Sequence, residues 1–185
     1  MKKVFFGVFI SAFLIACNEK ADDKQATSTN ETLSASEKKP ATEVLDLGEA
    51  DGVKAGVAAF TKGDIDGMTA TYDDNIRYYF SGGDSLIGKQ AVKDYYTGRW
   101  KLIDSITYSE QIYLPIRINE SQSPKYATAG KWVLSWALGH VKYKNGKKLN
   151  LWIHTDYYYN DAGKVATVVQ YLDRHPIMEA TKGMK

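Results

Sequence analysis

Three residues near the carboxyl end of the chain carry side chains that could transfer protons. His154, Asp156 and Asp173 lie in two segments rich in β-branched and aromatic residues, which flank the sequence N-D-A-G at 160–163. Asp and Gly in so short a connection are typical of a hairpin turn, so residues 148–174 are predicted to form a β-hairpin. A carboxylate in an apolar pocket has a raised pKa, which makes it a better base near neutral pH. These residue types therefore indicate general acid/base chemistry at a carbonyl substrate.

Side-chain alternation along a strand predicts which residues accompany these three. His154 and Asp156 are two positions apart, so they share one face with Trp152 and Tyr158. If the turn aligns the two strands so that these sets face the same way, then Thr167, Val169, Tyr171 and Asp173 lie on that same face. We predict a site with His154, Asp156 and Asp173 as catalytic groups and with these ligand-binding residues: Tyr72, Tyr96, Trp100, Trp152, Tyr158 and Tyr171. Tyr158 or Tyr171 could donate a hydrogen bond to a developing enolate oxygen.

A structural role for the same residues is the alternative. His154 and Asp156 could form a pair that satisfies its own hydrogen bonds, and Asp173 could cap a loop or pair with Arg174 or Arg99. The remaining histidines, His140 and His175, are predicted to lie at the surface. No third ligand stands at a recognised spacing from the His154–Asp156 pair, so neither a metal nor another cofactor is expected.

Composition predicts one soluble-type globular domain with extensions. The chain has 185 residues, of which 44% are hydrophobic, with 13 Tyr, 4 Trp and a formal net charge of only +2. So small a charge gives no support for nucleic acid as a partner. A small-molecule ligand is expected as the partner instead.

The amino-terminal segment is predicted to be an export signal. Lys2 and Lys3 precede an apolar run at 4–16, and the sequence L-I-A-C at 14–17 resembles the lipobox of bacterial lipoproteins. The resemblance implies lipidation of Cys17, attachment to a membrane of the bacterial cell envelope and, because Asn18 follows, sorting to the outer membrane or cell surface. The alternative is an ordinary signal peptide or anchor with an incidental Cys. Residues 18–47, rich in polar and charged side chains, are predicted to be a disordered tether.

Helical and strand patterns then follow in a clear order from residue 48. Helices are predicted at about 47–60, 65–72 and 89–102, and strands at 76–80, 105–118, 127–143, 149–159 and 164–174. This order predicts an α+β domain at 48–178, followed by a flexible tail at 179–185. Three helices would cover the concave face of a curved, cone-shaped antiparallel sheet.

The strand predicted at 127–143 suggests a second surface. Trp132, Leu134, Trp136 and Leu138 alternate with a set of smaller residues, Val133, Ser135, Ala137 and Gly139. The small set is predicted to line the cone, which places the larger set on the outer face. An exposed apolar patch of that size is unfavourable unless it is covered, so we expect a homodimer through this face.

Several short motifs resemble the nuclear transport factor 2-like superfamily, and within it the SnoaL-like branch. They are A-A-F-T-K-G-D-I-D-G-M at 58–68, T-Y-D-D-N-I at 71–76, I-G-K-Q-A-V-K-D-Y-Y at 87–96, and D-A-G-K-V with Q-Y-L-D at 161–165 and 170–173. The resemblance implies a cone-shaped pocket fold found in cyclases, isomerases, epoxide hydrolases and dehydratases, and also in binding modules without chemistry. It implies a pocket position for Asp156 and Asp173, whereas no family motif matches His154. Two functions follow. The one we favour is an envelope-tethered module that binds a small apolar or aromatic ligand or a partner, and the alternative is a SnoaL-like enzyme of the isomerase, cyclase or dehydratase type.

Overall fold

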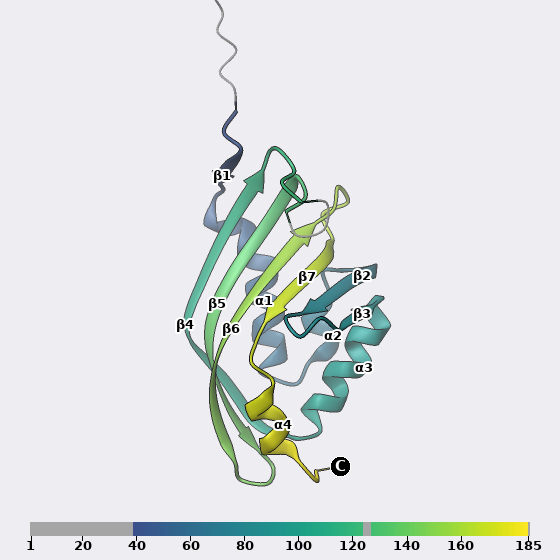
Figure 1. The fold of residues 1–185 in the computed structure, drawn as a ribbon, viewed down its shortest axis with the longest axis vertical. Coiled ribbons are helices and arrows are strands. Elements are labelled where there is room, and N and C mark those ends of the chain that lie inside the picture. The colour runs from purple at the N-terminus through teal and green to yellow at the C-terminus, as the bar shows by residue number, and fades with distance from the viewer. Residues whose placement is uncertain (1–38, 124–126, 185) are drawn as a thin grey trace, which may run out of the picture. The chain divides into compact units, whose positions relative to one another are not determined.

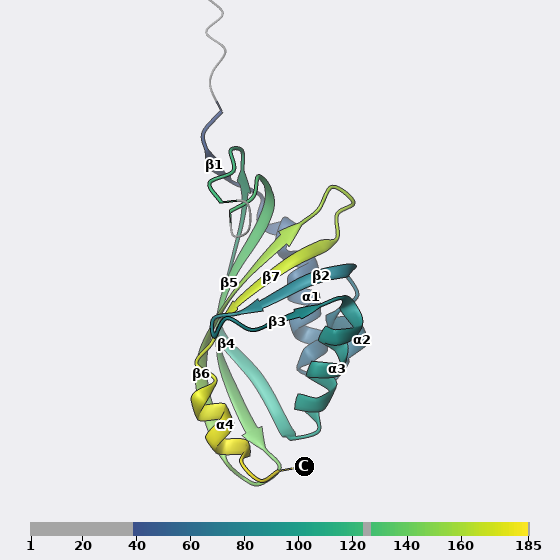
Figure 2. The ribbon, with the colours of Figure 1, turned by 45° about the vertical axis from the view of Figure 1, so that its right-hand side comes forward.

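A curved sheet of seven strands forms one layer of the fold, and helices form the other (Figures 1 and 2). The computed structural model describes residues 39–123 and 127–184. The strands are β1 (Thr42–Val44), β2 (Tyr72–Phe80), β3 (Ser85–Ile87), β4 (Ile103–Ile118), β5 (Gly130–Tyr143), β6 (Lys148–Tyr159) and β7 (Val165–Tyr171). Their order across the sheet is β1-β4-β5-β6-β7-β2-β3. The α+β class and the curved sheet are confirmed.

The sheet is mixed, whereas a purely antiparallel sheet was predicted. β2 pairs parallel with β7, with Tyr78 opposite Val168, while the other strand pairs are antiparallel. The long strands β4 to β7 form the predicted meander. β2 and β7 are neighbours in the sheet although they are far apart in the chain. Such a long-range pairing leaves no local signal in the sequence.

Two tight turns set the register of the central strands. Between β5 and β6, the Gly146 amide donates to the Tyr143 carbonyl at 2.8 Å, and Gly146 adopts a φ of 86°. Between β6 and β7, the Gly163 amide donates to the Asn160 carbonyl at 2.9 Å, with a φ of 69° at Gly163. Glycine tolerates this left-handed conformation without steric cost, which explains the N-G and D-A-G sequences at these positions.

The helical layer lies against the concave side of the sheet, as Figure 2 shows for α1, α2 and α3. Its elements are a 3₁₀ turn η1 (Leu47–Ala50), α1 (Asp51–Phe60), α2 (Ile65–Met68), α3 (Lys89–Trp100) and the carboxyl-terminal α4 (His175–Thr181). Val53 and Phe60 bury the inner face of α1. Asp64 caps α2 by accepting a hydrogen bond from the Gly67 amide at 2.7 Å. The three predicted helices, which are α1, α2 and α3 in the structure, therefore lie in the predicted layer.

The ordered part of the domain extends beyond both predicted boundaries. β1 lies within the segment 18–47 that was predicted to be a tether, and it pairs with β4, with Thr42 opposite Ile118. At the other end, the last predicted strand stops at Tyr171, and α4 continues past residue 178 to bury Ala180. Pro176 in the first turn favours this helix start.

The predicted signal segment 1–17, including Cys17, lies outside the described residues, as does the tether as far as residue 38. Within the described part of the chain, each helix is too short or too polar to cross a lipid bilayer.

Candidate functional site

The predicted catalytic pair lies on the convex face of the sheet, opposite the helices. Residues paired directly across neighbouring strands share a face, and His154 is paired with Trp136 of β5 and with Tyr171 of β7. The β6 residues that line the interior are the alternate set, which includes Ile153 and Tyr157. The prediction that Trp152, His154, Asp156, Tyr158 and Tyr171 line the cone is therefore wrong.

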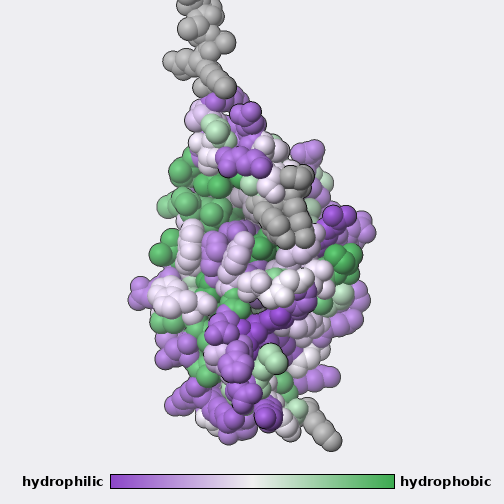
Figure 3. Space-filling view, viewed as in Figure 1, coloured by the Kyte–Doolittle hydropathy of each residue, from purple (hydrophilic) through white to green (hydrophobic). Residues whose placement is uncertain are grey.

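The reason lies in the sequence of β6, in which both alternating sets are largely apolar or aromatic. Alternation then groups residues into faces correctly but does not say which face points inward. Pairing with β5 decides the question, because Ser135 and Ala137 do line the interior, as predicted for the small set. Figure 3, in the view of Figure 1, shows hydrophobic residues (green) interspersed with hydrophilic ones (purple) on this side of the molecule.

On this convex face, His154 and Asp156 form a close pair, and the proton on Nδ1 of His154 can be assigned. His154 Nδ1 donates to the Ser135 carbonyl at 3.0 Å, which leaves Nε2 directed at Asp156 Oδ1, also 3.0 Å away. The imidazole is stacked between the Trp136 and Tyr171 rings, at centroid distances of 4.5 and 5.4 Å. Burial raises the pKa of Asp156, and the neighbouring His154 opposes this shift.

The packing around His154 favours a structural role for this pair, but the pair does not satisfy its own hydrogen bonds as that alternative predicted. Although Nε2 of His154 is close, Asp156 Oδ1 is buried and receives no well-aligned hydrogen bond. The Trp136 and Tyr171 rings stack on His154, so the faces of its imidazole are occupied. The structure thus brings His154, Asp156 and Tyr171 together as predicted, but away from the interior.

Asp173 lies apart from this pair, in the connection between β7 and α4. It is exposed and accepts a hydrogen bond from the His175 amide at 2.9 Å, which is the loop-capping alternative. Arg174 pairs instead with Asp84, with 2.8 Å between Nη1 and Oδ2. Among residues 39–123 and 127–184, no three His, Cys, Asp or Glu side chains are arranged to hold a metal ion.

The other predicted residues divide between the interior and the surface. Tyr72 and Tyr96 line the interior cavity, as predicted for ligand-binding residues. Trp100 packs on Phe60, with ring centroids 5.8 Å apart, and borders an open groove between α2 and α3. Trp152 is 58% exposed on the convex face. His140 also lies on that face, with Nε2 2.8 Å from the Ser109 hydroxyl.

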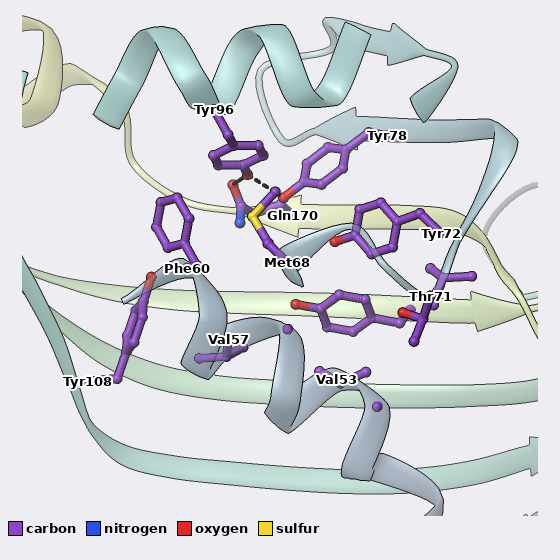
Figure 4. Close-up of a pocket in the computed structure, with 14 residues that line it drawn as sticks. Val53, Val57, Phe60, Met68, Thr71, Tyr72, Tyr78, Tyr96, Tyr108 and Gln170 are labelled. Atoms are coloured by element: carbon purple, nitrogen blue, oxygen red, sulfur yellow. Dashed lines mark hydrogen bonds between the residues drawn. The ribbon is translucent and has the colours of Figure 1, made fainter. Parts of the chain in front are cut away.

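A cavity of about 70 Å³ lies between the sheet and helices α1 to α3 (Figure 4). Tyrosine side chains from strands β2, β4 and β6 and from α3, together with apolar residues of α1 and α2, surround it. Its lining consists of Gly52, Val53, Gly56, Val57, Phe60, Met68, Thr71, Tyr72, Tyr78, Tyr96, Tyr108, Tyr157, Val165 and Gln170. We take this cavity as the candidate functional site, because it is concave, mostly apolar and contains a few converging polar groups.

A chain of hydrogen bonds crosses the cavity wall from Tyr78 to Thr155. The Tyr78 and Tyr96 hydroxyl oxygens are 2.5 Å apart, and Tyr96 donates to Gln170 Oε1 at 3.4 Å, so Tyr78 is the donor to Tyr96. Gln170 Nε2 in turn donates to Thr155 Oγ1 at 3.5 Å. Figure 4 shows the two hydroxyls meeting beside Gln170. Successive donors in one direction strengthen one another in such a low-dielectric interior.

The protonation of these groups is fixed at neutral pH. Burial raises the pKa of Tyr96 to about 12, although the hydrogen bond from Tyr78 partly opposes this shift. Burial also raises the pKa of Tyr78 and Tyr72 well above the ordinary value of 10.0. All three hydroxyls therefore stay neutral and act as hydrogen-bond donors or acceptors.

The chemistry available to the cavity is thus binding and polarisation. No Asp, Glu, His or Lys occurs among the described residues that line it. Neutral hydroxyl donors among apolar side chains can hold or polarise a carbonyl oxygen. General acid/base transfer near neutral pH requires a group that titrates there, and none stands among the lining residues that the structure describes.

Sequence reasoning missed Tyr78, Tyr108, Tyr157 and Gln170 as site residues. Tyr157 and Gln170 lie in the predicted hairpin, on the face opposite to the one chosen. Tyr108 and Tyr78 lie in predicted strands where neighbouring residues are also aromatic or apolar. The signal that would have found them is strand pairing with the small residues of β5, because these must face the crowded interior.

The fold is that of NTF2-like proteins, as shown by comparison with solved structures. An NTF2-like protein of unknown function from Burkholderia pseudomallei K96243 has a TM-score of 0.55 and 15% identity, covering 73% of this chain and 98% of its own. An NTF2-like protein from Burkholderia xenovorans LB400 has a TM-score of 0.53 and 18% identity, with coverage of 72% and 95%. TerC, co-crystallised with polyporic acid, has a TM-score of 0.51 and 15% identity, with coverage of 71% and 95%. No known family model and no curated protein sequence matches the chain.

Proposed function

We propose that this domain is a ligand-binding module that holds a small, mostly apolar ligand in the cavity between sheet and helices. The observation that carries the proposal is the cavity lining, in which neutral hydroxyl and amide groups stand among apolar side chains. The titratable His154–Asp156 pair lies on the other side of the sheet. A ligand with an aromatic ring and one hydrogen-bond acceptor matches the chemistry of this lining.

An enzyme that enolises a carbonyl substrate is the second candidate. The Tyr78–Tyr96 pair favours it, because two buried hydroxyls 2.5 Å apart can stabilise a developing enolate oxygen. Such a reaction also requires a base within reach of the substrate. Because the described part of the chain places no carboxylate or imidazole in the lining, we favour binding over catalysis.

One pair of measurements separates the two candidates. Acetophenone serves as the probe, since it combines one ring with one carbonyl group, and its binding is measured by calorimetry. We expect binding by the wild-type protein and by the control Tyr158→Phe on the convex face, and about tenfold weaker binding by Tyr96→Phe. Deuterium exchange at the acetophenone methyl group, followed by NMR in D₂O, tests catalysis. Exchange above the buffer rate would favour the enzyme, and equal binding by Tyr96→Phe would contradict the proposed site.

We also propose that the module is tethered to the bacterial cell envelope. The sequence L-I-A-C at 14–17 supports lipidation of Cys17, and the polar segment that follows supports a spacer between membrane and domain. Incorporation of a palmitate analogue by the wild type, and its loss in Cys17→Ser, is the expected result. Labelling that persists in the variant would contradict the proposal.

A homodimer through the convex face is the proposed assembly. Trp152, Ile112 and Tyr171 are 58%, 55% and 45% exposed, an unusual amount of large apolar surface for one face of a sheet. Light scattering at micromolar concentration is expected to report a dimer for the wild type and a monomer for Trp152→Asp. A monomeric wild type would refute this assembly.

A further inference from the structure

Two further cavities adjoin the one described above, and the three share walls. Each of the additional cavities has a volume of about 60 Å³. One lies toward α3 and α4, where Ile177 borders it, and the other lies toward Ser135 of β5. Tyr108 and Gln170 line all three cavities. These two side chains are therefore common to the walls of all three cavities, while other residues are shared by two of them.

Size shows why this division matters for a ligand. A cavity of roughly 150 Å³ accommodates a benzene ring in a protein core. Each of the three cavities is less than half that size, so none of them accepts an aromatic ring by itself. Their combined volume exceeds that threshold. Ring binding in this interior thus requires a dividing side chain to move.

Gln170 is the divider that can move at low cost. Its two hydrogen bonds, from the Tyr96 hydroxyl and to Thr155 Oγ1, measure 3.4 and 3.5 Å, at the long limit for such bonds. The side chain is only partly buried. Tyr108 is more constrained, because its ring packs against the backbone of the neighbouring strand at Gly139, where an added Cβ would lie 3.3 Å from the ring.

The position of the Gln170 amide oxygen also indicates what replaces it. Tyr78 donates to Tyr96, and the Tyr96 proton is directed at Gln170 Oε1. When Gln170 turns away, that proton loses its acceptor inside an apolar space, which is unfavourable until another acceptor takes its place. A carbonyl oxygen has the same hydrogen-bonding character as the amide oxygen of Gln170.

We propose that Gln170 is a displaceable partition whose amide oxygen occupies the place of the ligand's carbonyl oxygen. A ligand with one aromatic ring and a carbonyl acceptor displaces it, joins the three cavities and accepts the hydrogen bond from Tyr96. Gln170 thereby determines specificity, since it excludes rings that lack an acceptor. This inference rests on the proposed ligand-binding function and adds the class of ligand and the residue that selects it.

The test compares acetophenone with ethylbenzene, which has a similar size and no acceptor, on four proteins by calorimetry. These are the wild type, Gln170→Ala, Gln170→Met and the control Gln90→Ala, whose side chain bonds to Asp94 on the outside of α3. Gln170→Ala is expected to bind acetophenone about tenfold more tightly than the wild type, equivalent to about 1.4 kcal/mol. It should also gain binding of ethylbenzene. Gln170→Met keeps most of the side-chain volume and is expected to gain less, and Gln90→Ala should match the wild type.

The possible results distinguish this inference from the proposed function. If the wild type binds acetophenone and Gln170→Ala binds it equally or more weakly, the partition is refuted while the binding function stands. If neither the wild type nor Gln170→Ala binds either probe, the proposed binding function fails. Circular dichroism melting curves verify folding, and if Gln170→Ala does not fold, Gln170→Met decides: affinity no higher than the wild type refutes the partition.

Discussion

Replacing the two buried tyrosines singly and together gives the sharpest test of the hydrogen-bond chain in the cavity wall. Tyr78 is 2% exposed and Tyr96 is 9% exposed, so water does not readily replace a lost partner. The order of donors makes the two substitutions unequal. Tyr78→Phe removes a donor, and Tyr96 still donates to Gln170. Tyr96→Phe leaves the Tyr78 hydroxyl, which is 2.5 Å from Tyr96 in the wild type, without its acceptor.

The magnitudes follow from the difference between a lost bond and an orphaned group. Loss of a single buried hydrogen bond costs about 0.5–1.5 kcal/mol, which is the expected destabilisation by Tyr78→Phe. A buried donor without an acceptor costs about 1–3 kcal/mol, which is the expected destabilisation by Tyr96→Phe. The double variant removes the orphaned hydroxyl as well. We therefore expect it to be more stable than Tyr96→Phe alone, by about 1 kcal/mol.

Urea unfolding followed by circular dichroism measures the free energy of unfolding of the four proteins in this double-mutant cycle. Tyr158→Phe on the convex face is the matched control and should differ little from the wild type. Strictly additive losses in the double variant would refute the reasoning. That result would mean that each hydroxyl is satisfied independently, for example by water in the adjoining cavity of about 70 Å³.

Two further predictions concern the helical layer and the convex face. Gly98→Ala lies on the exposed side of α3, where an added Cβ meets open space, so it should stabilise the protein by about 0.5–1 kcal/mol in urea unfolding. Gly56→Ala on α1 should destabilise the protein, because its Cβ would lie 3.0 Å from the Met68 carbonyl oxygen. Equal effects would contradict this account of the α1–α2 contact. Since burial raises the pKa of Asp156 above 3.8, its contribution to stability is present below that pH and is lost as pH rises through the folded-state pKa. The stability of the wild type relative to Asp156→Asn should therefore fall with increasing pH, and a difference that grows with pH would overturn this assignment.

Much of the local structure followed from patterns in the sequence. The N-G and D-A-G turns, the helices near 51–60 and 89–100, and the long strands from residue 103 onward are all present. Alternation correctly grouped His154 with Asp156 and Tyr171. These features depend on residues close together in the chain, where turn chemistry and periodicity act directly.

Other elements left weak signals because their partners are distant in the sequence. β1 is three residues long and depends on pairing with β4 more than seventy residues later, with Thr42 opposite Ile118. The parallel pairing of β2 with β7 likewise joins Tyr78 to Val168. α4 was not predicted, because its residues follow the strand predicted at 164–174 and run into the tail predicted at 179–185. Its few apolar residues gain their stability by burial in the folded domain.

By itself, the sequence determined which residues share a face, where the chain turns, and that the domain is a curved sheet covered by helices. Only the tertiary structure decided which face of β6 points inward. Both alternating sets of that strand are apolar enough to be buried, so hydrophobicity does not distinguish them. Crowding decides: the small residues of β5 and the helical layer leave room for Tyr157 and Gln170, and the paired strands send His154 and Asp156 to the convex side. The candidate site is therefore the set of neutral tyrosines in the interior and not the proton-transfer pair on β6.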